Sequence, residues 1–207
     1  MNRSTQRIRS PFAPQANKSY LAFNKPYGVV SQFSAIENSE KQTLAEFQFP
    51  KDVYPIGRLD WDSEGLLILS DDGQLNHKLL DPQNEHARTY MAQVENIPDD
   101  AALRKLCSGV VIEGKKTLPA EASLIADPEL PPRPVPIRFR KNIPTSWIEL
   151  RIHEGRNRQV RKMTAAVGHP TLRLVRAAIG SLSLFDLNIA PGAWTRLTAH
   201  QVLRLFE

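Results

Sequence analysis

The sequence predicts an α+β fold built on a mixed, largely antiparallel β-sheet with a few flanking helices. Two observations support this prediction. Short strand-like runs outnumber the helical patterns, and several of them alternate apolar with polar residues, as strands with one buried face do. The regular alternation of one strand with one helix, which is typical of a parallel α/β fold, is missing.

The strand-like segments are mostly short. In chain order they are residues 20–23, 28–33, 66–70, 89–95, 110–112, 120–125, 135–140, 147–153 and 172–177. Such a series of short runs is typical of antiparallel pairing between neighbouring segments.

Helical patterns are fewer. Residues 99–107 open with two acidic residues, which suit the N-terminus of a helix. Residues 157–167 end at Gly168, and glycine readily adopts the left-handed conformation that ends a helix. The third pattern runs from a candidate N-cap at Thr198 to Phe206.

One break in composition lies between residues 128 and 136, where prolines occupy positions 128, 131, 132, 134 and 136. Proline fixes φ and lacks an amide hydrogen, so this segment should be an extended and stiff connection. We expect it to separate two lobes of one domain.

The length of 207 residues favours one domain of catalytic size, because a domain typically has about 150 residues. The chain has 41% hydrophobic and 24% charged residues, and no run approaches the roughly 20 apolar residues of a membrane span. The N-terminus lacks the apolar core of a signal peptide, and Cys107 is the only cysteine, so an intramolecular disulfide is excluded. We therefore expect a cytoplasmic protein with no membrane association.

Positive charge gathers in two parts of the chain, whose net charge is +5. Residues 1–36 contain five basic residues and no acidic one, and residues 130–176 contain 11 basic and 2 acidic residues. This distribution favours a polyanionic partner, although charge that only keeps the protein soluble is the alternative, above all for the N-terminus. Ser, Asn, Gln and Pro in residues 1–17 also indicate a disordered basic tail ahead of a domain that spans residues 18–207.

Two motifs resemble ligand-binding loops, but each lacks a residue that binding of the ligand requires. Gly109, Gly114 and Lys115 match a phosphate-binding loop, yet a lysine follows where Ser or Thr would hold magnesium. The acidic run that begins at Asp60 imitates a calcium loop, but its last ligand, Asp71, is too short and no helical pattern flanks it. The histidines form no metal pair at helical spacing. We therefore expect no metal and no cofactor, which favours chemistry performed by side chains alone.

The most informative segment is residues 57–73, GRLDWDSEGLLILSDDG, in which a polar turn leads into an apolar strand. Loops held by such strands often carry active groups. A tight turn is the alternative, with local hydrogen bonds from Asp62 and Ser63 and with Asp60 as one more turn residue. The segment closely resembles the GRLDxxSEGLLLLTNDG motif of the pseudouridine synthases that modify ribosomal RNA, and it departs from that motif only at Ile68, Ser70 and Asp71.

Three further blocks follow in the order of the same family. Residues 25–31, KPYGVVS, resemble its N-terminal KPxG motif with the following serine, and residues 88–90, RTY, resemble its basic-Thr-Tyr motif. Residues 154–163, EGRNRQVRKM, resemble its EGRNRQVRRM segment, which begins a helix. The resemblance covers the chain from about residue 20 to its end. It implies the pseudouridine synthase fold, with two lobes around a basic catalytic cleft.

The resemblance also implies a reaction. Uridine becomes its isomer pseudouridine when the N1–C1′ bond breaks and the sugar rejoins the base at C5, so no atom or electron needs to be supplied by a cofactor. The family's aspartate maps onto Asp60, and its role stays open between attack on C1′, addition to C6 and proton abstraction. An ionised carboxylate in a site closed against water needs a cation within a few ångströms, and Arg161 matches the family's basic partner.

The helical spacing of the basic residues is consistent with the assignment of Arg161 as the partner of Asp60. Arg158, Arg161 and Lys162 share one face at i, i+3 and i+4, and an apolar face lies opposite at Val160, Met163, Thr164 and Val167. An ordinary basic surface helix is the alternative.

The resemblance assigns Tyr90 to stacking on the target base, where residue type alone would favour a strand tyrosine in the core. The nucleotide must leave the RNA stack at a cost of a few kcal/mol, and stacking on an aromatic ring offsets about 1–3 kcal/mol of this cost. Arg58 matches the family residue that fills the space vacated by the base. Phosphate contacts are expected from Lys25, Arg156, Arg158 and Lys162, with Arg133, Arg138, Arg140 and Lys141 as outer contacts.

Taken together, the residues and the resemblance predict a monomeric isomerase that acts on one uridine of large-subunit (23S) ribosomal RNA. Its expected catalytic residues are Asp60, Tyr90 and Arg161. The small-subunit type of the family carries an additional N-terminal RNA-binding module, for which this chain has no room. A non-catalytic RNA-binding protein of ribosome assembly is the alternative, and the presence of all three residues argues against it.

Overall fold

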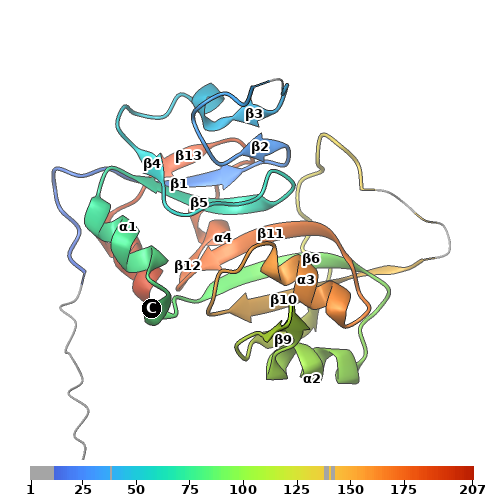
Figure 1. Cartoon of the computed structure of the whole chain (residues 1–207). Coiled ribbons are helices and arrows are strands. Elements are labelled where there is room, and N and C mark those ends of the chain that lie inside the picture. Colours follow the sequence, from blue (N-terminus) through green and yellow to red (C-terminus); the bar gives the residue numbers. More distant parts are fainter. Residues whose placement is uncertain (1–11, 38, 138–139, 141–142) are drawn as a thin grey trace, which may run out of the picture.

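The computed structural model describes residues 12–37, 39–137, 140 and 143–207, and its largely antiparallel sheet with few helices confirms the predicted fold class (Figure 1). The main sheet has the strand order β13-β1-β5-β11-β6-β10-β9, with β4 paired to β5 and β12 paired to β11. Two halves can be distinguished along this order. The upper half contains β1 (Tyr20–Lys25), β4 (Tyr54–Pro55), β5 (Glu64–Ser70) and β13 (Trp194–Arg196), and the lower half contains β6 (Arg88–Glu95), β9 (Glu121–Ile125), β10 (Thr145–Ile152), β11 (Thr171–Ile179) and β12 (Leu182–Ser183).

The remaining elements flank this sheet or extend it. Two small sheets are formed by β2 (Val29–Val30) with β3 (Gln42–Thr43) and by β7 (Val111–Ile112) with β8 (Lys115–Lys116). The helices are α1 (Gly73–Leu80), α2 (Asp100–Ser108), α3 (Gln159–Ala166), α4 (Leu184–Leu187) and α5 (Ala199–Leu203), and the single 3₁₀ turns are Leu44–Phe47, Pro82–Asn84 and Arg204–Phe206. Among the residues that the structure describes, none of the helices combines the length and the hydropathy that a membrane span needs.

The strand β5 is the centre of the upper half, and all seven of its residues are buried. Leu66 and Ile68 point into one apolar cluster with residues of α1, α5 and the C-terminal turn, whereas Leu67 and Leu69 point into a second cluster with residues of β1. Alternate residues of one strand therefore fill two cores, which explains why this segment reads as a continuous apolar run. This packing fixes the strand that follows the polar loop at residues 57–63.

The lower half is covered by helices on one face only. Ala92 and Val94 of β6 pack with Ile148 of β10 beneath α2 and α3, and Val160 and Met163 supply the apolar side of α3. The expected apolar face of this helix is thereby confirmed, with Thr164 also buried and Val167 packed at its edge. Arg88 and Tyr90 lie on the same face of β6 as Ala92, because alternate residues of a strand share a face.

The two halves join where β5 meets β11 in a parallel pairing of two residues, Val175 with Glu64 and Arg176 with Gly65. Gly65 has φ +103°, and a Cβ atom at this position would lie 2.4 Å from the carbonyl oxygen of Arg176. Glycine is therefore needed for the close approach of the two backbones. Beside this join, Glu64 accepts two hydrogen bonds from the guanidinium of Arg173 at 2.9 and 2.7 Å, and both side chains are buried.

Most expected elements are present. The strands expected at residues 20–23, 66–70, 89–95, 110–112, 120–125, 147–153 and 172–177 correspond to β1, β5, β6, β7, β9, β10 and β11, and the three helical patterns correspond to α2, α3 and α5 with its 3₁₀ extension. Thr198 caps α5 with a capping box, and Gly168 has φ +90° just after α3. The expected strand at 28–33 shrinks to Val29–Val30, the two residues that pair with β3.

The proline-rich segment does not separate the two lobes. It connects β9 to β10, which are antiparallel neighbours within the lower half. Residues 135–137 and 140 are not in a strand, contrary to the expectation for 135–140, and residues 138 and 139 lie outside the described part. The segment instead lies beside the join, because the carbonyl of Pro131 accepts a hydrogen bond at 2.8 Å from Arg173, whose guanidinium also binds Glu64.

The N-terminal segment packs from residue 12 onward, six residues before the expected start of the domain. Phe12 is buried, its ring stacks on that of Phe206 with centroids 5.0 Å apart, and it belongs to the same apolar cluster as Leu66. Of the expected disordered tail at 1–17, residues 1–11 lie outside the described part.

Candidate active site

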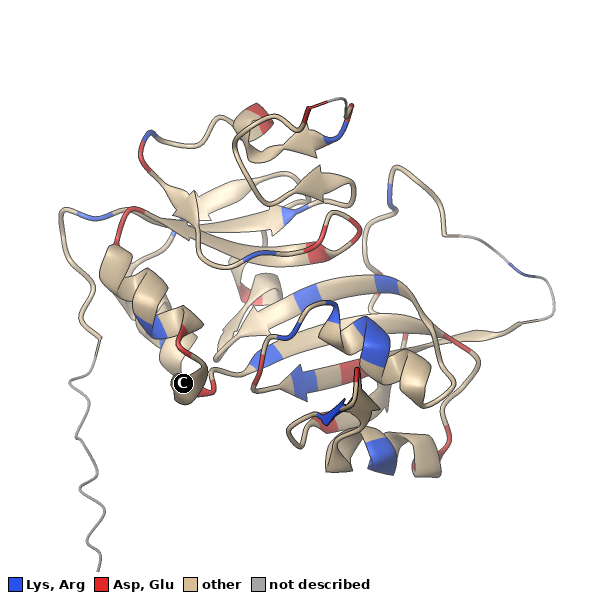
Figure 2. Ribbon diagram, viewed as in Figure 1, with Lys and Arg blue, Asp and Glu red and all other residues tan. Residues whose placement is uncertain are grey.

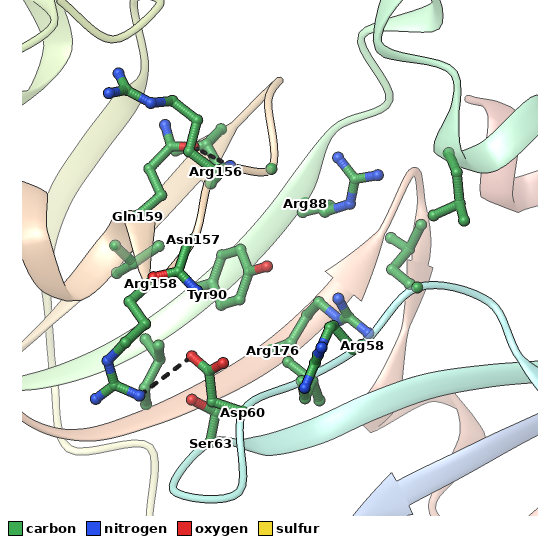
Figure 3. Close-up of a pocket in the computed structure, with 18 of the residues that line it drawn as sticks. Arg58, Asp60, Ser63, Arg88, Tyr90, Arg156, Asn157, Arg158, Gln159 and Arg176 are labelled. Atoms are coloured by element: carbon green, nitrogen blue, oxygen red, sulfur yellow. Dashed lines mark hydrogen bonds and ion pairs between the residues drawn. The ribbon is translucent and has the colours of Figure 1, made fainter. Parts of the chain in front are cut away.

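A pocket of about 470 Å³ lies where the two halves join. Its walls come from the loop that precedes β5, from one face of β6 and β11, and from the segment that leads into α3 (Figure 3). The polar residues that line it are Arg58, Asp60, Ser63, Arg88, Tyr90, Arg156, Asn157, Arg158, Gln159 and Arg176. The lining thus contains five guanidinium groups and one carboxylate, which favours a polyanionic ligand with a flat ring. This arrangement agrees with the expected basic cleft between two lobes.

The loop that carries Asp60 is held by the segment at residues 25–31. The hydroxyl of Ser31 accepts a hydrogen bond from the amide of Leu59 at 3.1 Å and donates one to the carbonyl of Leu59 at 2.8 Å. The amide of Gly28 donates to the carbonyl of Trp61 at 2.7 Å, and Gly28 has φ +85°. Two blocks far apart in the sequence therefore meet, and the first fixes the backbone on both sides of Asp60.

Lys25 also stabilises the segment at residues 25–31, and its side chain does not reach the surface. Its side chain is fully buried, and its ammonium donates to the carbonyls of Pro26 at 2.9 Å and Val29 at 2.7 Å. Burial lowers the pKa of Lys25 to about 7, although the nearby carboxylates of Glu64 and Asp62 act in the opposite direction. The expected phosphate contact of Lys25 is therefore not available, because the strand β1 turns this side chain into the interior.

The charge partner of Asp60 is Arg158. The guanidinium of Arg158 lies 3.4 Å from the carboxylate of Asp60 and also makes two hydrogen bonds to Asp62, at 3.0 and 2.7 Å. Arg161, the expected partner, contacts Asp62 instead: it donates to the carbonyl of Asp62 at 2.7 Å, and its guanidinium lies 3.5 Å from the Asp62 carboxylate. Arg158 reaches Asp60 because it stands just before α3 with φ +50°, off the helical face on which the sequence placed it.

Asp62 organises both arginines. Burial acts to raise the pKa of the Asp62 carboxyl, but the hydrogen bonds from Arg158 and the positive charges of Arg161 and Arg158 outweigh it, so the pKa lies below the usual range. The same contacts raise the pKa of Arg158. Asp62 therefore stays ionised at neutral pH and holds the guanidinium of Arg158 beside Asp60.

Tyr90 lies in the middle of the pocket wall, as Figure 3 shows. It is half-buried and packs against apolar residues of both halves. Arg176 of β11 is its cross-strand partner, and Arg58, an exposed residue of the loop before β5, also lines the pocket. One side of the Tyr90 ring is therefore accessible to a planar ligand. Residue type alone would favour a tyrosine in the core, and this ring is only partly in the core.

The remaining expected RNA contacts fall into three groups. Arg156 lines the pocket, and its guanidinium is held by the carbonyls of Ile112 at 2.7 Å and Lys115 at 3.1 Å. Lys162 lies outside the pocket lining and pairs with Glu113 at 2.6 Å. Of the outer contacts, Arg133 lies 4.4 Å from the ring centre of Tyr27 and Arg140 pairs with Glu95 at 3.2 Å, whereas Arg138 and Lys141 lie outside the described residues.

Sequence reasoning missed three residues of this site, namely Asp62, Arg88 and Arg176. Asp62 was interpreted as a turn residue and Arg88 only as part of a motif. Arg176 could have been found, because it is a charged residue within an otherwise apolar strand and such residues are seldom buried without a ligand or a partner. Around the pocket, Lys and Arg gather on α3 and on the strands of the lower half (Figure 2). In the described part of the chain, no group of three or more His, Cys, Asp and Glu side chains is placed to hold a metal ion.

Comparisons with known proteins agree on one family. Residues 19–166 match the family model described as RNA pseudouridylate synthase. The chain is similar to a protein of Xanthomonas campestris pv. campestris named ribosomal large subunit pseudouridine synthase E, with 55% identity over 175 residues, 84% of this chain and 92% of the relative. A protein of the same name from Vibrio vulnificus is 48% identical over 183 residues, 88% of this chain and 76% of the relative.

Among solved structures, the chain is similar to one titled crystal structure of pseudouridylate synthase, with a TM-score of 0.73 and 28% identity. That likeness covers 91% of this chain and 74% of the other. The motif order, the pocket between two halves and these matches agree, and the chain belongs to the RNA pseudouridylate synthase family.

Proposed function

We propose that this protein isomerises a uridine of large-subunit ribosomal RNA to pseudouridine, with Asp60 as its catalytic carboxylate. The observation that carries the proposal is that Asp60 is the single carboxylate among the described lining residues of a pocket that also holds Tyr90 and five arginines. The relatives named as large-subunit synthases support the choice of RNA.

The pocket suggests how the reaction proceeds. A uridine extruded from the RNA places its uracil against the ring of Tyr90, and the sugar then faces Asp60. Arg158 supplies the counter-charge at 3.4 Å, and Arg161 is a positioning residue that acts through Asp62. Because the product is an isomer of the substrate, the balance is complete when the N1–C1′ bond breaks, the C5–C1′ bond forms, C5 loses its proton and N1 gains one.

The reaction is tested by mapping pseudouridine in unmodified large-subunit ribosomal RNA after incubation with the wild-type protein and with Asp60→Asn, without added nucleotide cofactor. We expect one new pseudouridine with the wild type and none with Asp60→Asn, whose RNA affinity should stay within a few-fold. Asp52→Asn, at an exposed position outside the pocket, is the matched control and should retain full activity.

Loss of product with both variants would show that the assay does not report on Asp60. If free RNA gives no product with the wild type, the same experiment is repeated on precursor ribosomal particles. Absence of product there as well would favour a non-catalytic RNA-binding role.

We also propose that the protein acts on its substrate as a monomer in the cytoplasm; Asp60, Tyr90 and Arg158, which come from three separate parts of the chain, already meet in one pocket. Light scattering of the purified protein, alone and with an RNA fragment, tests the monomer.

A further inference from the structure

Three arginines in the pocket have no acidic partner among the residues that the structure describes. Arg58, Arg88 and Arg176 lie on one side of Asp60 and Tyr90, opposite the segment that carries Arg156 and Arg158 (Figure 3). Ion pairs within the described residues involve Arg158, Arg161 and Arg173 near this pocket, but none of these three. Their charge is therefore available to a ligand.

Arg176 is the most deeply placed of the three. It is 4% exposed, its Nε donates to the carbonyl of Leu66 at 2.7 Å, and its Nη2 is buried without a hydrogen-bond partner in the described structure. A buried donor on a charged group costs free energy when it is unpaired. Since Arg176 stands opposite Tyr90 in the pairing of β11 with β6, this unpaired donor belongs to the wall on which the base would lie.

Arg88 is held in a fixed orientation next to it. Its guanidinium donates to the carbonyls of Leu79 at 3.1 Å and His86 at 3.3 Å, which lie behind it at the end of α1 and in the loop before β6. Burial lowers the pKa of Arg88, and the positive charge of Arg176 lowers it further. Because the charge of Arg176 disfavours the charge of Arg88, an anion bound beside these two guanidiniums would stabilise the pair.

We propose that Arg88 and Arg176 form a binding site for one of the two phosphodiester groups that flank the target uridine, with Arg58 at its rim. Guanidinium groups match phosphate oxygens in geometry as well as charge. The uracil and the sugar are placed by Tyr90 and Asp60, so a phosphodiester of the same nucleotide enters the side of the pocket where the three arginines lie. The site thus holds the backbone of the extruded nucleotide, and this inference rests on the proposed function.

The test uses a ribosomal RNA fragment that contains the mapped target uridine. In two modified fragments, a neutral methylphosphonate replaces the phosphodiester on the 5′ or the 3′ side of that uridine. The dissociation constant and kcat/KM are measured with the wild type, with Arg88→Met and with Arg104→Met. Arg104 is an exposed arginine on α2 outside the pocket and provides the matched control.

We expect one of the two methylphosphonates to weaken wild-type binding about 10- to 100-fold, as the loss of a charged hydrogen bond does. Arg88→Met should show a similar loss with the unmodified fragment and no further loss with that methylphosphonate, whereas Arg104→Met should behave as the wild type does. The proposal is overturned if neither methylphosphonate affects the wild type, or if Arg88→Met remains as sensitive as the wild type.

Arg88→Lys protects the test against a folding defect in Arg88→Met, because it keeps the charge and loses only the forked geometry. It should retain part of the sensitivity to the same methylphosphonate, and full wild-type sensitivity and affinity would argue against a guanidinium site. The two proposals fail differently: absence of pseudouridine in the unmodified fragment concerns the reaction, whereas the binding measurements concern the phosphate site alone.

Discussion

Two arginines stand near the catalytic loop with different tasks, and single substitutions separate them. Arg158→Gln removes the cation 3.4 Å from Asp60, so we expect kcat to fall about 10- to 100-fold. It also removes two hydrogen bonds to Asp62, but the Arg158 side chain is 38% exposed, so the free energy of unfolding should fall by only about 1 kcal/mol. Arg161→Gln leaves the Asp62 carbonyl without its donor in a largely buried place, so the free energy of unfolding should fall by about 1–3 kcal/mol.

Single-turnover rates and urea unfolding of both variants check this assignment. If Arg161→Gln abolishes turnover at unchanged stability while Arg158→Gln remains active, then Arg161 is the residue that acts on Asp60 when RNA is bound. That result would restore the assignment made from the family motif.

Lys25 links stability to pH. Its pKa is about 7 in the folded protein, against 10.5 for the ordinary side chain, so between these values the unfolded chain binds the extra proton and stability rises with pH. Below pH 7 both states are protonated and this contribution is constant. The free energy of unfolding of the wild type relative to Lys25→Met should therefore increase from pH 7 to pH 10, by at most about 1.4 kcal/mol per pH unit.

Urea unfolding of the wild type, Lys25→Met and the exposed-site variant Lys51→Met at several pH values measures this effect. The comparison with Lys25→Met cancels groups that titrate in both proteins. A difference that falls with rising pH, or that is equally present for Lys51→Met, would contradict the assignment of the pH dependence to Lys25.

At the scale of elements, the join of β5 with β11 depends on Gly65. An alanine there would combine φ +103° with a Cβ atom 2.4 Å from a backbone oxygen that no side-chain movement can displace. We expect Gly65→Ala to lower the free energy of unfolding by about 2–5 kcal/mol and to reduce activity, because the same join holds the Asp60 loop against Arg176.

Gly73→Ala is the matched control. A Cβ atom at Gly73 would meet nothing within 4 Å, and this residue opens α1, where alanine is the better helix former. Thermal unfolding of both variants should show a clear loss for Gly65→Ala and no loss for Gly73→Ala. Equal stability of the two variants would mean that widening the gap between β5 and β11 does not lower the free energy of unfolding.

The elements that the sequence predicted are those whose local pattern agrees with their packing. The strand β5 was predicted from its apolar run, and α2 was predicted from the two acidic residues that open it, of which Asp99 is the N-cap in the structure. Helix α1 was not predicted, although Asp72 caps it and Leu75 and Leu79 lie four residues apart, because eight residues span only about two helical turns and give a weak periodic signal. The pairing of Val29 with Gln42 could not be predicted, since two-residue strands carry no periodicity.

Prediction of the site from the sequence is limited in the same way, because a local pattern does not show which side chains meet. Asp60 and Tyr90 were expected from their motifs and line one pocket. Arg161 was expected from its motif beside Asp60 but contacts Asp62, and Lys25 was expected at a phosphate but is buried. Lys25 is buried because its side chain points from β1 into the interior. Arg158 meets Asp60 because its backbone has the left-handed conformation. Neither is encoded in a spacing pattern.

For the whole molecule, the distribution of charge predicts how binding depends on salt. The chain carries Arg3, Arg7 and Arg9 ahead of Phe12, the first residue that the structure describes. Each phosphate contact to single-stranded or duplex RNA contributes about 0.7–0.9 to the slope of log affinity against log salt. If these arginines contact RNA, deletion of residues 2–11 should lower that slope by up to about 2–3 and leave the stability unchanged.

A longer deletion, of residues 2–17, separates the tail's electrostatic contribution from its packing. It also removes Phe12, whose buried ring contacts Phe206 and Lys78, so the free energy of unfolding should fall by about 3–5 kcal/mol. Binding measured from 50 to 300 mM salt should then show the same slope for both deletions, because residues 12–17, by which the deletions differ, carry no charge. An unchanged slope after the shorter deletion would place the whole electrostatic contact on the pocket and the lower half, and the basic N-terminus would then have no part in holding the RNA.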